Sequence, residues 1–266
     1  MTVKKMLATL PLVLNACGGE EETSYTPNEP GQGIWEGAIS ADVINSSTSA
    51  SGAVSTFEAT SATGLLVYSS YITRNNYDGY RAFFYKDDDG SLFTNDSPGV
   101  ANNNLIFAPD VYKNGVQAGG VAFDGTTATS TSIYGQYLGY AAGNYVMLFD
   151  QAYFRGADLA RLTGTWNYTP PAENDIGDWS LSFLSDGSFT ISSTISASCS
   201  GNGAFFIIGD GSKNEYDVSI VLSNCGAFDG AYYGLAATID TVSQNDTISM
   251  AFYNADNGFF LKPTKN

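Results

Sequence analysis

The chain has 266 residues, which is enough for one or two domains. Gly, Tyr and Phe are abundant (29, 17 and 16 residues), and this composition favours short strands and many turns over helices. The formal net charge of −16 makes the surface repel nucleic acid, so no nucleic-acid partner is expected. The absence of histidine excludes Ser-His-Asp and Cys-His catalysis and HExxH zinc chemistry.

Residues 1–16 have the pattern of a secretion signal. Two lysines precede an apolar run, Met6–Leu14, that is far shorter than the roughly 20 residues needed to span a bilayer. The following sequence, Leu14-Asn15-Ala16-Cys17, resembles the lipobox of bacterial lipoproteins. This resemblance implies cleavage before Cys17 and acylation of that residue, for example with palmitate. The alternative is an ordinary signal peptide followed by an incidental cysteine.

The residue after Cys17 is Gly18 rather than Asp, which resembles lipoproteins that are passed on to the outer membrane. The resemblance therefore implies a chain held at the outer membrane by the covalent lipid on Cys17. Residues 17–32 carry the run Glu20–Glu22 and no apolar periodicity, so we expect a flexible acidic tether with a reach of roughly 20–25 Å. The tether is either a plain linker or a surface-export signal, and the periplasmic and surface orientations both stay open.

Residues 33–160 are expected to form a first β domain. Runs of β-branched and aromatic residues, several of them alternating, predict its strands. The expected strands are Ile34–Ser40, Val54–Ala59, Gly64–Ile72, Tyr80–Lys86, Leu92–Thr94, Leu105–Ala108, Gln117–Asp124, Ser130–Tyr137 and Asn144–Asp150. The segment 153–162 is expected to be a connector with one helical turn.

An Asp-Gly pair between two of these strands predicts a hairpin. Asp87-Asp88-Asp89-Gly90-Ser91 separates Tyr80–Lys86 from Leu92–Thr94, and glycine accepts the positive φ that a tight turn requires. The three aspartates also suggest calcium. They lack the alternating oxygen ligands and terminal Glu of an EF-hand loop, so we predict a turn without metal.

Residues 161–266 are expected to form a second β domain with a cleaner pattern. Trp179–Phe183 alternates strictly between apolar residues and serine, Ser185–Ser188 forms a turn, and the alternation continues from Phe189. One face of this hairpin is apolar and the other hydroxylated, as a half-buried antiparallel hairpin requires. Tyr216–Leu222 and Thr247–Phe252 predict further strands.

Both domains open with Gly-x-Trp: Gly33 and Trp35 in the first, Gly164 and Trp166 in the second. This opening resembles the first strand of lipocalin and avidin-like up-and-down barrels, in which glycine lets the strand bend and tryptophan plugs the closed end. The layout also resembles uncharacterised envelope lipoproteins of Gram-negative bacteria and, in general plan, surface lipoproteins of the transferrin-binding type. We therefore expect an all-β protein of two tandem antiparallel β-barrel or sandwich domains.

Three further pairs of segments suggest an internal duplication. Asp89–Phe93 matches Asp186–Phe189, Ile133–Gly139 resembles Gly230–Ala236, and Asn144–Asp150 resembles Asp246–Tyr253 as the closing strand. The alternative interpretation is a single sandwich with chance similarities.

Cys199 and Cys225 remain once Cys17 is assigned to the lipid. Two cysteines in one small domain of an exported protein predict a disulfide, which would stabilise the fold by roughly 3–3.5 kcal/mol in the entropic picture. Redox and metal roles are the alternatives.

No catalytic residue, cofactor or metal is predicted. The expected function is that of a non-enzymatic lipoprotein that binds a ligand, a glycan or an envelope protein through barrel loops or a cavity. Tyr134, Tyr137 and Tyr140 are the candidate binding aromatics, since tyrosine offers area and a hydroxyl at low entropic cost. The alternatives are an assembly factor for another envelope protein and a carbohydrate-active enzyme with a carboxylate pair. A membrane-spanning barrel is disfavoured because the strands are short.

Overall fold

The computed structural model describes residues 33–40, 62–74, 77–86, 90–95, 99–101, 104–106, 108–128, 131–140, 142–172, 174–240 and 243–266. The expected signal, Cys17, the tether, the strand Val54–Ala59 and Asp87–Asp89 lie outside these residues. Among the residues that are described, no helix has the length and apolar character needed to cross a membrane.

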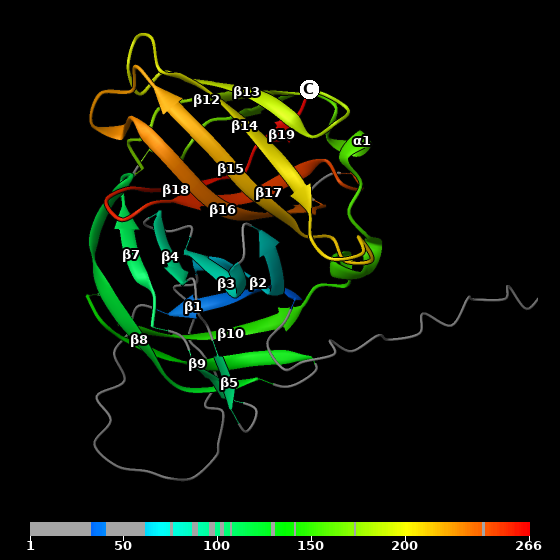
Figure 1. The fold of residues 1–266 in the computed structure, drawn as a ribbon. Helices are drawn as coiled ribbons and strands as arrows, with labels where there is room; N and C mark the ends of the chain where they lie inside the picture. The colour runs from blue at the N-terminus through cyan, green and yellow to red at the C-terminus, as the bar shows by residue number, and fades with distance from the viewer. Residues whose placement is uncertain are drawn as a thin grey trace, which may run out of the picture.

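The first half of the chain forms a closed antiparallel barrel in which each strand pairs with its neighbours in chain order (Figure 1). The last strand pairs with the first, Trp35 lying opposite Phe149. The eight strands are β1 (Gly33–Ser40), β2 (Ala62–Arg74), β3 (Tyr77–Lys86), β4 (Ser91–Asn95), β7 (Asp110–Lys113), β8 (Val116–Ala128), β9 (Ser132–Gly139) and β10 (Gly143–Phe149). A separate hairpin is formed by β5 (Gly99–Ala101) and β6 (Asn104–Ile106).

The second half forms a nine-stranded sheet that curls until its two arms meet through the pairing of β16 with β17. Its final strand, β19, pairs with both β11 and β17, so the pairings run through a complete ring. The strands are β11 (Gly164–Tyr168), β12 (Trp179–Phe183), β13 (Ser188–Ser193), β14 (Ser200–Ile207), β15 (Tyr216–Ser223), β16 (Gly230–Ile239), β17 (Thr247–Tyr253), β18 (Gly258–Leu261) and β19 (Thr264–Lys265). The expectation of an all-β protein with two β domains is confirmed.

Two short helical segments connect the halves, where the sequence predicts a connector with one helical turn. The 3₁₀ helix η1 (Gln151–Arg155) begins after Asp150, whose carboxylate accepts a hydrogen bond from the Ala152 amide. The single-turn helix α1 (Leu159–Leu162) is capped in the same way by Asp158. A further 3₁₀ turn, η2 (Gly226–Phe228), lies between β15 and β16.

The two β bodies pack together through a shared apolar cluster. Phe83, Tyr85 and Leu92 on the outside of the first barrel belong to the same buried cluster as Leu235, Ala251 and Phe260 of the second sheet. The rings of Tyr85 and Phe260 stack with their centroids 3.8 Å apart. The strands β17 and β18 and the second half of β16 are consequently buried on both faces. The sequence of β18 is apolar throughout, whereas β17 still alternates and buries the polar Thr247 and Ser249.

The structure corrects most of the predicted internal correspondences. Asp186–Phe189 opens β13, the third strand of its ring, whereas Asp89–Phe93 leads into β4, the fourth. The other two pairs also differ by one strand position. Gly230–Ala236 and Asp246–Tyr253 lie in β16 and β17, the sixth and seventh strands of the second ring, whereas Ile133–Gly139 and Asn144–Asp150 lie in β9 and β10, the seventh and eighth strands of the first. Neighbouring strands of a meander run in opposite directions, so these similarities reflect common hairpin chemistry. Only the two Gly-x-Trp openings occupy equivalent strands.

Candidate functional site

A row of small uncharged polar side chains covers the outer face of β11 to β14. The strand register aligns them in two rungs that run across the strands. We call this surface the polar face; its first rung is Asn167, Ser180, Ser192 and Ser200, and its second is Thr165, Ser182, Thr190 and Asn202. Neighbouring strands in a sheet lie about 4.8 Å apart and residues two apart on one strand about 7 Å, so the face is a regular array.

Two adjoining hollows lie on the polar face. The first has a volume of about 400 Å³ and is bounded by Asn167, Asp178, Ser180 and Thr194 among others. The second, of about 480 Å³, lies over Ser182, Thr190, Ser200 and Asn202. Ser180 and Ser192 line both hollows, so the two hollows share a border.

The local sequence builds this face by alternation. In β12 the apolar Trp179, Leu181 and Phe183 point inward and are buried, which leaves Ser180 and Ser182 outside. In β14 two of the positions that point inward are occupied by glycine, Gly201 and Gly203. A Cβ on Gly203 would lie 2.3 Å from the Phe189 ring, so the glycine makes room for that ring inside the sheet.

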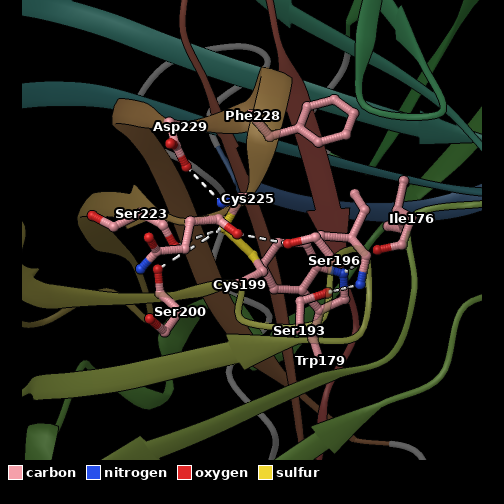
Figure 2. The surroundings of a disulfide bond; sticks show 12 residues. Ile176, Trp179, Ser193, Ser196, Cys199, Ser200, Ser223, Cys225, Phe228 and Asp229 are labelled. Atoms are coloured by element: carbon pink, nitrogen blue, oxygen red, sulfur yellow. Dashed lines mark hydrogen bonds between the residues drawn. A yellow bond between two sulfur atoms is a disulfide. The ribbon is translucent and has the colours of Figure 1, made fainter.

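A disulfide joins two loops beside the first hollow (Figure 2). Cys199 and Cys225 are linked, as the sequence predicts, and both are buried. The Cys225 amide donates to the Asp229 carboxylate at 2.6 Å, and the Ser196 hydroxyl donates to the Asn224 carbonyl at 2.6 Å. This end of the sheet is therefore held by covalent and hydrogen-bonded cross-links between β13, β14 and β15.

The polar groups of the face are available to a ligand. Of its eight side chains only Asn167 forms a hydrogen bond within the described residues, to Asn266 at 3.0 Å. Seven of the eight are exposed and Ser180 is half-buried. Charged groups lie only beside the face. Asp178 lines the first hollow, and Asp186 has its pKa lowered by hydrogen bonds from the Ser188 hydroxyl and amide.

Side chains fill the interior of the first barrel and of the curled second sheet wherever the structure describes them. In the first, the rings of Phe84, Phe93, Phe123 and Tyr145 pack against one another with centroids 5.2–6.4 Å apart. In the second, Trp179 and Phe259 make an edge-to-face contact at 5.4 Å. Both β bodies therefore have a packed core that contains aromatic side chains.

The two predicted strand-opening motifs lie where the sequence places them. Trp35 and Trp166 are fully buried on the first strands β1 and β11. The Trp166 indole donates to the Leu162 carbonyl at 2.6 Å, which ties α1 to the strand. Gly33 and Gly164 have φ of +141° and +122°, a region that favours glycine.

The three candidate tyrosines do not lie together. Tyr134 and Tyr140 are exposed on the outside of the first barrel, whereas Tyr137 is buried within its core. Residues three apart on a strand point to opposite faces, so a single platform cannot hold both Tyr134 and Tyr137. Tyr137 is therefore a packing residue.

The sequence alternation in β12 and β13 indicates outward hydroxyl groups, but it does not show which strands lie side by side. The sequence does not predict that β14 contributes to the polar face, because Gly201 and Gly203 interrupt the apolar alternation of this strand. As for metals, the described residues contain no group of three His, Cys, Asp or Glu side chains suited to hold an ion. Comparison of the chain with protein-family models, with curated protein sequences and with solved structures found no match.

Proposed function

We propose that this chain is a non-catalytic binding lipoprotein of the bacterial envelope. In this proposal Cys17 is acylated and anchors the protein at the outer membrane, and the polar face binds an uncharged, polyhydroxylated ligand such as a neutral glycan. The observation that carries the binding part is the pair of adjoining hollows on the polar face, since the interiors of the first barrel and of the curled second sheet are packed with side chains. Binding is accordingly assigned to the outer surface.

Electrostatics selects a neutral ligand. Neither hollow is lined by a lysine or arginine, and the chain carries a net charge of −16. A phosphorylated, sulfated or uronic-acid ligand would be repelled and would have no counter-charge at the site. Hydroxyl and amide groups donate and accept hydrogen bonds at once, which matches the chemistry of sugar hydroxyls.

Side-chain size disfavours a protein partner at the same face. Protein interfaces depend on a few large anchors such as Trp, Tyr and Arg, and serine is depleted in them. Trp179 and Tyr168 line the first hollow, but both side chains are buried below it. An array of serines, threonines and asparagines supplies hydrogen bonds and no anchor.

The carboxylates favour binding over hydrolysis. Glycoside hydrolases need two carboxyl groups on either side of the scissile bond, about 5–9.5 Å apart. In the described part of the chain Asp178 is the single acid that lines either hollow. We therefore propose that the protein releases a bound glycan without hydrolysing it.

Amide chemical shifts would test the ligand class. Titration with neutral oligosaccharides (maltohexaose, cellohexaose and chitohexaose) is expected to shift amides of β11 to β14, with dissociation constants on the order of millimolar for hydrogen bonds without an aromatic platform. The variant Thr190→Asp/Ser192→Asp should weaken this binding at least tenfold. Ala122→Asp, an exposed strand position on the first barrel, is the control. No shift with any neutral sugar, or equal binding by the double variant, would refute the site.

The anchor is tested separately. Mass spectrometry of the mature chain should find diacylglyceryl and fatty-acyl groups on Cys17, and globomycin or Cys17→Ser should block processing. A mature protein that begins downstream of Cys17 would refute the anchor. Protease shaving of intact cells would then distinguish a surface-facing from a periplasmic protein.

A further inference from the structure

The sequence contains three Asn-Gly pairs, and the structure places them in different surroundings. They are Asn114-Gly115, Asn202-Gly203 and Asn257-Gly258. An asparagine followed by glycine can react with its own backbone, because a glycine without a Cβ leaves its amide nitrogen open to approach the side-chain carbonyl carbon of the asparagine. The backbone conformation and the hydrogen bonds of each pair decide which of the three reacts in the folded chain.

Asn114 and Gly115 form the two-residue turn between β7 and β8. Lys113 pairs with Val116 across the turn, and the two central residues have φ of +51° and +79°, which is typical of a type I′ hairpin. The amide of the second central residue lies outside the hydrogen-bonded ladder in such a turn. Asn114 is exposed, and its side chain forms no hydrogen bond within the described part of the chain. Neither reacting group is therefore held by a hydrogen bond of its own.

The other two pairs are held in place. Asn202 and Gly203 lie in β14, which has a strand on each side, so the ladder uses the Gly203 amide. Asn257 is only 9% exposed, and its side-chain amide is hydrogen-bonded to a backbone carbonyl. The Gly258 amide donates to the Gly115 carbonyl at 3.1 Å. Both glycine nitrogens are therefore occupied in the folded chain.

We propose that Asn114 is a site of spontaneous deamidation. The Gly115 nitrogen gives up its proton to solvent and attacks Cγ of Asn114, the side-chain nitrogen leaves as ammonia, and a succinimide ring closes. Water then opens the ring at either carbonyl. One opening gives aspartate, and the other gives isoaspartate, in which the main chain runs through Cβ and Cγ. Over both steps one water is consumed and one ammonia is released, and either product carries a new carboxylate.

The same turn is a docking point between the two β bodies, where β7 meets β18 (Figure 1). Gly115 is buried, and a Cβ on it would lie 2.7 Å from the Phe259 ring, so the glycine packs directly against the second ring. Just after the turn, the Gln117 amide donates to the Asp256 carbonyl at 2.8 Å. The reactive pair therefore belongs to the contact that joins the two bodies.

Docking and deamidation oppose each other. In a type I′ turn the glycine nitrogen is not aligned with Cγ, so the turn must open before the ring closes, and the contact of Gly115 with Phe259 resists that opening. Isoaspartate adds one carbon to the main chain of the turn, so the lengthened turn no longer fits this contact. The new carboxylate also adds negative charge to a chain whose net charge is already −16. Deamidation of Asn114 therefore loosens the contact between the two bodies.

Peptide mapping of the folded full-length chain, aged in mildly alkaline buffer, tests the site. Deamidation should be at least tenfold faster at Asn114 than at Asn202 or Asn257, and an isoaspartyl methyltransferase should label the Asn114 peptide. In urea the three asparagines should react at similar rates, because only the flanking sequence then distinguishes them. A folded chain in which Asn114 reacts no faster than the other two would overturn the site. The same tenfold preference in urea would show that the fold does not select it.

A variant beside the turn tests the link to docking. Phe228 is half-buried, and its ring also adjoins Gly115, so Phe228→Ala should raise the deamidation rate of Asn114 at least threefold. Leu184→Ala, an exposed position elsewhere on the second ring, is the control and should leave the rate unchanged. Equal rates in the two variants would overturn the link between docking and reactivity.

Hydrogen exchange tests the consequence. The Gly258 amide, which donates to the Gly115 carbonyl, should exchange at least tenfold faster in the deamidated chain than in the fresh one. Asn114→Gly preserves a turn with positive φ and cannot deamidate, so its Gly258 amide should stay protected through the same ageing. Unchanged exchange in the deamidated chain, or equal loss of protection in Asn114→Gly, would show that the modification does not loosen the contact.

Discussion

Trp35 and Trp166 occupy the same position in their two rings. Each is fully buried on the first strand, two residues after a glycine with positive φ, and each lies opposite a residue of the last strand. The covering residues differ: the Phe149 ring meets Trp35 edge-on at 5.1 Å, and the Lys265 ammonium lies 5.2 Å from the Trp166 ring centroid. The two openings therefore share a backbone conformation, and different side chains cover their tryptophan rings.

This difference predicts unequal tolerance of the two glycines. Alanine at either position adopts an unfavourable positive φ, which costs about 1–2 kcal/mol. A Cβ on Gly33 would also lie 2.5 Å from the Phe149 ring, whereas on Gly164 the nearest atom is the flexible Lys265 Cε at 3.5 Å. Urea denaturation should show Gly33→Ala to be the more destabilising substitution. Equal losses would mean that Phe149 moves aside freely.

A partly buried ion pair joins the two β bodies. Arg81 donates to Asp217 at 3.0 Å and to the Gly234 carbonyl at 3.1 Å, and the Asp217 side chain is only 6% exposed. Arg81→Met would leave that carboxylate without this partner, and removing one partner of a buried pair costs about 3–5 kcal/mol.

The pair between Arg155 and Asp240 is the matched control because it is much more exposed. Exposed pairs contribute about 0–1 kcal/mol, so Arg155→Met should change the free energy of unfolding by no more than that. Chemical denaturation of both variants makes the comparison. A loss of less than 1 kcal/mol for Arg81→Met would show that the apolar cluster alone holds the two bodies together.

The disulfide should stabilise the second ring. The linked cysteines are separated by 26 positions, and closing a loop of that size contributes roughly 3.5 kcal/mol in the chain-entropy picture. Cys199→Ala/Cys225→Ala is expected to lower the midpoint of urea unfolding, and reduction of the native chain should do the same. Mass spectrometry under non-reducing conditions checks the link itself; two free thiols in the native protein would contradict it.

Buried tyrosines predict loss of stability at alkaline pH. Burial raises the pKa of Tyr232 to about 12, and burial also raises the pKa of Tyr168 and Tyr216. The tyrosines of the unfolded chain ionise near their ordinary pKa of about 10. The free energy of unfolding should therefore fall as the pH rises from 10 towards 12. Each tenfold difference in acidity corresponds to about 1.4 kcal/mol.

Absorbance of tyrosinate and circular dichroism, recorded together through this range, test the alkaline prediction. Part of the tyrosinate signal should appear only as the fold is lost. Tyr232→Phe removes one buried hydroxyl, which donates to the Phe228 carbonyl at 2.7 Å, and should shift the unfolding midpoint to higher pH. Complete ionisation of all tyrosines near pH 10 in a chain that stays folded would contradict the expectation.

Local patterns were sufficient for most of the architecture. Strict alternation predicted β12 and β13, the Asp-Gly pair predicted the turn in which Gly90 adopts a φ of +68°, and the Gly-x-Trp openings predicted the first strand of each ring. These features depend on side-chain periodicity and on the conformational freedom of glycine, which are properties of neighbouring residues.

Other features depend on residues that are distant in sequence. The burial of β16 and β17 on their outer side follows from cover by the first barrel, and the sequence does not predict β14 because its glycines make room for Phe189. The polar face likewise needs the register of four strands. Alternation determines which side chains share a face of a strand. Only the tertiary structure decides which face is covered, because the covering residues come from elsewhere in the chain.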